Sequence, residues 1–256
     1  MTALVFFLGF AYTDSFYHYF GLDVATLGFG TPDLLLRGSP ALYLPVGCLL
    51  FGMLLMALAF HLASRRGATR WVRTVCPVLA ATALPLLLLG FLAGFEVVDL
   101  GQGAAPLLIG GALLLAVLAR ALFVHVTRSR YPLPGERAAV AVVVAIVVLC
   151  SFWAATAYAH VKGTGDARRL STRLYQRPAM VVDTTERLYL AWPAVRESRL
   201  DDAGPGQRFH YRYHGFRLLA QYGPRMILIP REWTWDSGSV LVLPLDADVR
   251  VSFHPG

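Results

Sequence analysis

Long apolar stretches separated by short arginine-rich loops constrain this chain more than any other feature. Each stretch has about 20 residues, the length that an α-helix needs to cross a hydrocarbon layer roughly 30 Å thick. Only 15% of all residues are charged, against about 25% in an average globular domain. The sequence therefore predicts an α-helical membrane bundle. The clearest stretches are Ala41–Ala63, Val75–Phe95, Ala105–Val126 and Ala138–Val161.

The N-terminal segment predicts a further span. Its apolar run covers Ala3–Tyr12, and Asp14 and an aromatic stretch from Phe16 to Phe20 follow. Aromatic side chains gather at membrane–water interfaces, so we expect a first helix whose outer end is an interfacial belt. A helix that is only half inserted is the alternative. The predicted transmembrane domain then covers residues 1–161, with five spans at residues 2–20, 41–63, 75–95, 105–126 and 138–161.

Two arginine-rich loops orient the bundle. The loop over residues 64–73 contains four arginines and the loop over residues 127–137 contains three, whereas residues 21–40 and 96–104 contain only Arg37. Basic loops are retained in the cytoplasm. The fifth span then ends outside, so we expect a plasma-membrane protein with an extracytoplasmic C-terminal domain. The basic residues after the last span oppose this count, but segments attached to long domains cross the membrane largely regardless of charge.

The composition changes near Lys162, where the C-terminal part begins. Residues 162–178 are basic and predict a juxtamembrane helix or linker, in which Arg168, Arg169 and Arg173 would contact lipid head groups. Residues 179–256 alternate between apolar and polar residues and contain Gly-Pro and Ser-Gly turn signals, a pattern typical of β-strands. We expect a small all-β domain with a small core, which leans on the bundle or on a neighbouring subunit. The expected strands are Ala179–Val182, Arg187–Trp192, Phe209–Leu219, Met226–Ile229, Val240–Leu243 and Val249–Phe253.

Ionisable residues near the outer ends of the spans are candidates for function, because charge at membrane depth is costly. Asp14 and His18 share one helical face through their i,i+4 spacing. Glu96 and Asp99 follow the third span, and His160 lies near the end of the fifth. Together these five residues predict an outer vestibule that concentrates cations. The alternative is that they are ordinary helix-end groups.

Two tryptophans mark the most unusual segment of the tail, residues 231–236. Trp233 and Trp235 would share one face of an extended strand. If exposed, they would form a partner or ligand surface. If buried, they would belong to the core of the small domain, which is the interpretation that we favour.

The sequence shows no catalytic motif of the common nucleophile, zinc, phosphate-loop or dinucleotide types, so we do not expect an enzyme. Cys48, Cys76 and Cys150 all lie within expected spans and predict neither a disulfide framework nor a metal site. We therefore expect no metal and no cofactor. The formal charge of +7 is explained by arginines at membrane boundaries, so nucleic acid is not an expected partner. Lys162 is the single lysine, which indicates a GC-rich bacterial genome.

Three functions follow from these features, in descending order. The first is a homo-oligomeric ion channel or a sensor, in which the β-domain assembles subunits or binds a ligand. It is motivated by small residues on helix faces, by a proline-kinked third span and by the acidic outer rim. The second is an accessory or scaffold subunit that binds another membrane protein. The third is an enzyme of envelope lipids, which ranks last because no acid/base constellation is present.

Overall fold

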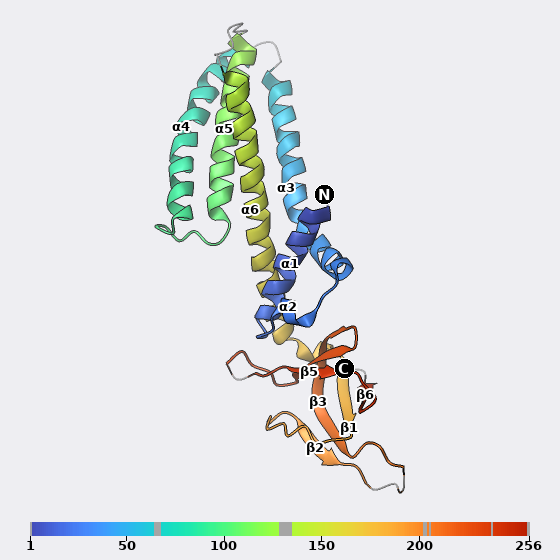
Figure 1. Ribbon diagram of the computed structural model, residues 1–256. Coiled ribbons are helices and arrows are strands. Elements are labelled where there is room, and N and C mark those ends of the chain that lie inside the picture. The colour runs from blue at the N-terminus through green and yellow to red at the C-terminus, as the bar shows by residue number, and fades with distance from the viewer. Residues whose placement is uncertain are drawn as a thin grey trace. The chain divides into compact units, whose positions relative to one another are not determined.

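The computed structural model describes residues 2–63, 68–127, 135–201, 204, 206–236 and 238–254 (Figure 1). The N-terminal region is helical, and the C-terminal region forms an antiparallel β-sheet. The chain divides into two compact units. The helical unit comprises Met1–Gly9 and Arg37–Val161, and the sheet unit comprises Phe10–Leu36 and Lys162–Gly256. Each unit is thus assembled from two separate parts of the sequence.

Within the described residues, three helices are long and apolar enough to cross a membrane, by length and composition. They are α4 (Ala68–Gly94), α5 (Ala104–Thr127) and α6 (Glu136–Ser171). This result confirms apolar helices where the sequence predicts spans at 75–95, 105–126 and 138–161, and it is compatible with a membrane location. Arg65, Arg66, Arg128 and Arg130 of the two basic loops lie outside the described residues.

The other two predicted spans are also helical, but they are not among these three. α1 (Thr2–His18) has 17 residues. α3 (Thr31–Ala63) begins well before the predicted start at Ala41, and the apolar stretch identified in its described part, Leu50–Ala59, is shorter than a span. A total of five spans therefore stays a prediction.

Small residues allow close packing among α4, α5 and α6. A Cβ atom at Gly90 of α4 would stand 2.8 Å from Cγ1 of Ile109 on α5. A Cβ atom at Gly110 of α5 would stand 3.2 Å from the Cβ of Cys150 on α6. The close helix contacts that the small residues predict are thus present. α4 remains helical through Pro77 and Pro85.

The sheet has six strands, all paired antiparallel (Figure 1). Five run in the order β5-β4-β3-β1-β6, and β2 pairs with the first half of β3. Five of the expected strands are confirmed to within a few residues at each end. The strand expected over Arg187–Trp192 is wrong, because these residues form a loop instead. The strands are β1 (Ala179–Thr184), β2 (Arg196–Arg199), β3 (Tyr211–Tyr222), β4 (Arg225–Pro230), β5 (Leu241–Pro244) and β6 (Val249–His254).

Alternation along β4 divides the apolar residues of the sheet between its two faces. Met226 and Leu228 belong to one cluster, and Ile227 and Ile229 belong to the other. We call the first cluster the loop core, because the loop before β2 covers it with Leu188, Leu190, Trp192 and Val195. We call the second cluster the segment core, because chain segments from outside the sheet cover it.

The segment core is completed by residues that precede α3 and by the end of α6. Tyr17, Phe20 and Leu27 are almost fully buried in it, together with Ala167 and Leu174. The interpretation of Phe16–Phe20 as an interfacial belt is therefore wrong. These rings lie on β3 and β4 instead, because a six-stranded sheet of this size needs an apolar layer over its second face. The short helix α2 (Val24–Leu27) supplies part of that layer.

α1 and α6 cross closely within the sheet unit. A Cβ atom at Gly163 of α6 would collide with the carbonyl oxygen of Tyr12 on α1, so only glycine fits at this crossing. The hydroxyl of Tyr12 donates a 3.0 Å hydrogen bond to Asp166, and Lys162 forms a 3.2 Å ion pair with the same carboxylate. These contacts fasten the ends of both helices to each other and to the segment core.

Candidate functional site

The five residues of the predicted vestibule belong to different units. Asp14 is half-buried on α1 and His18 is the exposed last residue of that helix, and both lie in the sheet unit. Glu96, Asp99 and His160 lie in the helical unit. The vestibule therefore stays a prediction.

Two of these residues have local roles in the turn between α4 and α5. The carboxylate of Asp99 accepts a 3.0 Å hydrogen bond from the backbone N–H of Gly101, which is the geometry of an Asx turn. Glu96 has a positive φ of 58° and is exposed. Turn formation is thus sufficient to explain why Asp99 stands at this position.

The basic residues after the last predicted span continue α6. Arg168 and Arg169 stand in the last turn of this helix, where positive charge stabilises the negative end of the helix dipole. Arg173 precedes a single 3-10 turn, η1 (Leu174–Gln176). All three arginines are exposed. Their predicted contact with lipid head groups stays a prediction.

The two tryptophans have opposite environments. Trp233 is 7% exposed and packs against Tyr19 and Phe20, whose ring centroids lie 5.8 Å and 5.0 Å from its own. Trp235 is 68% exposed. The segment that carries them is a turn rather than a strand, so the two rings do not share a face. The core interpretation holds for Trp233, and Trp235 remains the candidate for a partner surface.

A polar network occupies the part of the sheet that the segment core leaves uncovered. Asp183 of β1 lies between Arg212 of β3 and Arg250 of β6 in the strand register. Its carboxylate accepts bonds of 2.7 Å and 3.0 Å from Arg212, and of 3.1 Å and 2.5 Å from Arg250. The guanidinium of Arg250 also stands 4.8 Å above the centroid of the Phe209 ring. Two cations thus surround one buried carboxylate.

The electrostatic consequence is a permanently charged cluster. The hydrogen bond from Arg212 lowers the pKa of Asp183 below its ordinary value, although burial opposes this shift. The same bond raises the pKa of Arg212. In the adjacent loop core, burial raises the pKa of Tyr213, whose hydroxyl accepts a 2.8 Å hydrogen bond from the N–H of Leu188. The Asp183 cluster therefore carries one net positive charge and serves to hold β1, β3 and β6 together.

A β-bulge shapes the neighbouring part of the same face. Gly215 has no partner on β1, because the register passes from Val181 opposite His214 to Met180 opposite Phe216. Its φ of 103° is favourable only for glycine, and an added Cβ atom would collide with the carbonyl oxygen of Ala194. The extra residue changes the alternation along β3, so His214 points away from the loop core while Phe216 points into it.

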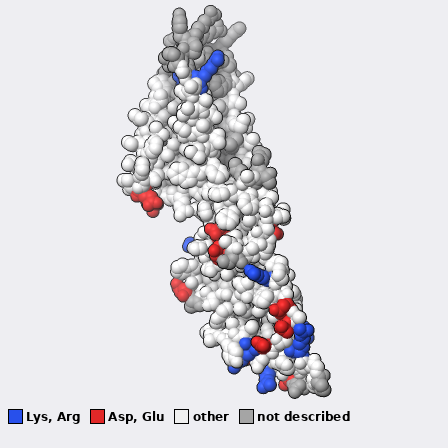
Figure 2. Space-filling model, in the orientation of Figure 1, with Lys and Arg blue, Asp and Glu red and all other residues white. Residues whose placement is uncertain are grey.

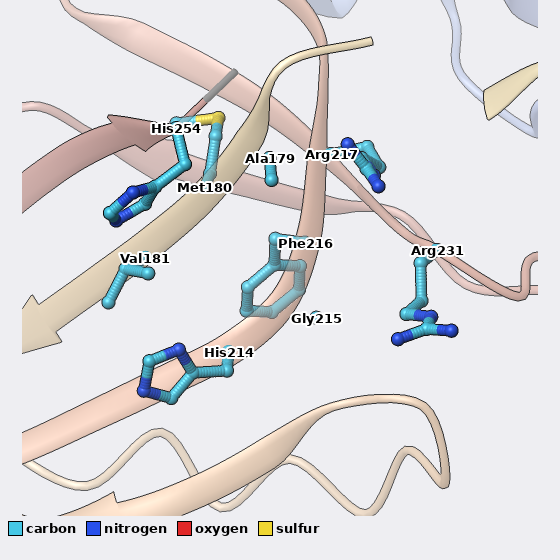
Figure 3. Close-up of a pocket in the computed structure, with 9 residues that line it drawn as sticks. All are labelled: Ala179, Met180, Val181, His214, Gly215, Phe216, Arg217, Arg231 and His254. Carbon is cyan, nitrogen blue, oxygen red and sulfur yellow. The ribbon is translucent and has the colours of Figure 1, made fainter. Parts of the chain in front are cut away.

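An open pocket of about 360 Å³ lies around this bulge (Figure 3). In Figure 3, His214 and His254 lie on one side of the Phe216 ring, and Arg217 and Arg231 lie on the other. Arg217 donates a 2.7 Å hydrogen bond to the carbonyl oxygen of Arg177, which orients its guanidinium. The pocket is lined by Ala179, Met180, Val181, His214, Gly215, Phe216, Arg217, Arg231 and His254.

The sequence analysis did not identify this pocket. It placed His214 on the face opposite the aromatic residues of β3, but nothing in a linear pattern connects β3 to His254 or to Arg231. The useful signal was Gly215, a glycine within a strand pattern, which is typical of a bulge. Among the described residues, no group of three or more His, Cys, Asp or Glu side chains is arranged to hold a metal ion.

Comparisons with known proteins place the chain in no family: no family model, no curated protein and no solved structure matches it. The site must therefore be interpreted from its own geometry.

Proposed function

We propose that this protein is a multi-pass sensor of the plasma membrane, and that its sheet unit is an extracytoplasmic ligand-binding module without catalytic activity. One observation carries this proposal: α1 and α6 each contribute residues to both compact units. The sheet unit is therefore not a domain on a flexible tether. It shares two continuous helices with the unit that contains the apolar spans.

The shared helices provide a physical route between the units. In the sheet unit, Tyr17 of α1 and Ala167 of α6 are buried against β3 and β4 in the segment core. A hydrogen-bonded helix is stiff over a few turns, and packed cores switch between discrete arrangements rather than deforming smoothly. A ligand that alters the packing of the sheet thereby acts on both helices.

The surface supports a membrane position for the helices. Figure 2 shows very few charged side chains over α4, α5 and α6, whereas blue and red groups gather over the sheet. A large apolar surface of this kind is typical of contact with lipid. The arginine content of the two predicted cytoplasmic loops supports an extracytoplasmic position for the sheet unit.

The proposal is tested by disturbing the sheet unit and measuring the helical unit. The hydroxyl of Tyr222 on β3 binds the segment before α3, so Tyr222→Phe loosens the segment core without removing a ring. Spin labels at Val97 and Val142, both exposed residues of the helical unit, report its conformation by electron–electron distance measurement in nanodiscs. The native cysteines are first replaced by alanine.

We expect Tyr222→Phe to shift or broaden the distance distribution between the two labels. Tyr189→Phe is the matched control, because Tyr189 is exposed and belongs to the loop before β2. Unchanged distances in Tyr222→Phe, with the sheet unit demonstrably loosened, would show that the two units are uncoupled and would end the sensor proposal.

A homo-oligomeric ion channel is the second candidate, and one observation favours it. Only 6% of the apolar window of α6 is buried within the chain, which leaves a long face for lipid or for a second subunit. The mass of the nanodisc particle separates the two: a fixed multiple of 28.1 kDa at three or more copies favours a channel. A monomer that co-purifies with another membrane protein would favour an accessory subunit.

A further inference from the structure

We propose that the pocket around the Gly215 bulge binds a phosphate group, and that His214, His254, Arg217 and Arg231 are the residues that hold it (Figure 3). This inference deepens the proposed function, on which it rests, by assigning the ligand class of the sensor. Nothing in the vestibule prediction or in the Asp183 cluster requires it.

The charge of the pocket favours an anion. Arg217 and Arg231 contribute two positive charges, and no carboxylate lines the pocket. Glu232 lies 3.5 Å from Arg231, but both side chains are mostly exposed, so water screens the pair. Asp183, on the same sheet face, is already saturated by Arg212 and Arg250. The positive charge of the pocket is therefore left for a ligand.

The hydrogen-bonding groups favour the same class. A guanidinium has five N–H donors in a planar fork, which matches two oxygens of a phosphate. Arg217 uses one of its donors to bind the Arg177 carbonyl, and this bond fixes the fork in place. Within the described part of the chain, the imidazoles of His214 and His254 have no hydrogen-bond partner, so both rings can bind further phosphate oxygens.

The backbone explains why these side chains converge. In regular β-structure, residues 214 and 217 would point to opposite faces, because the side-chain period is two. The bulge at Gly215 adds one residue to β3, so His214 and Arg217 lie on the same face. The register then places Arg217 opposite Ala179, and Ala179 opposite His254 on β6. Alanine between two long side chains leaves the space that a ligand fills.

The size and the charge of the pocket narrow the ligand further. A volume of about 360 Å³ is at the lower end of small-molecule sites. Two arginines balance the charge of a phosphate monoester, roughly −1.5 to −2 near neutral pH, better than that of a single carboxylate. We therefore assign a phosphate group, carried either by a small solute or by a lipid head group.

The test is calorimetric titration of the full chain with inorganic phosphate, in nanodiscs of phosphatidylcholine. We expect saturable binding that Arg231→Gln and His254→Gln weaken, the first by about tenfold because a charge-assisted hydrogen bond is lost. Arg208→Gln is the matched control, since Arg208 is similarly exposed but pairs with Asp248 outside the pocket. Absence of saturation at millimolar phosphate, or an equal loss in Arg208→Gln, would overturn the assignment.

A second set of nanodiscs, containing phosphatidylglycerol, identifies the source of the phosphate. If a lipid head group is the occupant, the affinity for added phosphate falls in these nanodiscs. If the ligand is a solute, the affinity stays the same. Either result upholds the pocket and assigns its ligand.

Failure of this inference is distinguishable from failure of the sensor proposal. The spin-label experiment uses Tyr222→Phe, which lies outside the pocket. Intact coupling without phosphate binding would remove only the pocket, whereas phosphate binding without coupling would leave a binding module that is not a sensor.

Discussion

The hydroxyl of Tyr222 on β3 donates a 2.9 Å hydrogen bond to the carboxylate of Asp33, 189 positions earlier in the chain. The same hydroxyl accepts a hydrogen bond from the backbone N–H of Gly30, and the Tyr222 ring packs against Phe29 with centroids 4.6 Å apart. One side chain of the sheet thus holds the segment that leads into α3.

Tyr222→Phe keeps the ring contact and removes both hydrogen bonds. We expect it to destabilise the sheet unit by about 1–3 kcal/mol, because the carboxylate of Asp33 and the N–H of Gly30 lose a partner in a half-buried place. Thermal unfolding followed by limited proteolysis of residues 19–30 measures the effect. Tyr189→Phe, at an exposed ring, should leave the midpoint unchanged, and an equal loss in both variants would contradict the role of Tyr222.

Asp183→Asn removes the charge that two arginines share. Breaking a buried ion pair costs about 3–5 kcal/mol, but Arg212 and Arg250 are partly exposed, so we expect about 2 kcal/mol. Chemical denaturation of the full chain in detergent measures the loss. Asp248→Asn is the control, because Asp248 is exposed and makes a single 3.4 Å contact with Arg208. A smaller loss in Asp183→Asn than in the control would disprove the clamp.

The same carboxylate makes stability depend on pH. Its pKa is lowered in the folded state, so its stabilising contribution is complete above the unfolded value of about 4 and is lost as the pH falls through the folded value. We expect the free energy of unfolding to fall steadily below about pH 4. In Asp183→Asn this acid dependence should be shallower, and parallel curves for the two proteins would rule out Asp183 as the cause.

The two tryptophans of the 231–236 turn should respond oppositely to truncation. Trp233→Ala removes a ring from the segment core, so we expect a loss of about 3–5 kcal/mol. Trp235→Ala removes an exposed ring and should change stability by less than about 0.5 kcal/mol. Differential scanning fluorimetry with an external dye compares them. Equal losses would show that Trp235 is covered in the folded protein.

The orientation of the chain is tested with single cysteines in a background without the native three. Ser198→Cys on β2 is exposed and should react with a membrane-impermeant maleimide in intact cells, because we place the sheet unit outside. Ser64→Cys, in the first arginine-rich loop, should react only after permeabilisation. The reverse pattern would invert the proposed topology.

Local patterns were sufficient for the apolar helices and for most strands. α4, α5 and α6 follow from 20-residue apolar stretches, because hydrophobic length is a property of neighbouring residues. β3 and β4 follow from alternation in the same way. β2 could not be predicted, because Arg196–Arg199 is a short exposed edge strand without any apolar alternation.

Sequence alone therefore determined the helical N-terminal region, the C-terminal sheet and the composition change at Lys162. The tertiary structure decided which residues complete that sheet and which form its pocket. Phe16–Phe20 has the same aromatic composition whether it faces lipid or protein, and only its packing against β3 and β4 separates the two. His214, Arg231 and His254 likewise meet only through strand register and a bulge. Register depends on contacts between distant strands, and no local pattern encodes these contacts.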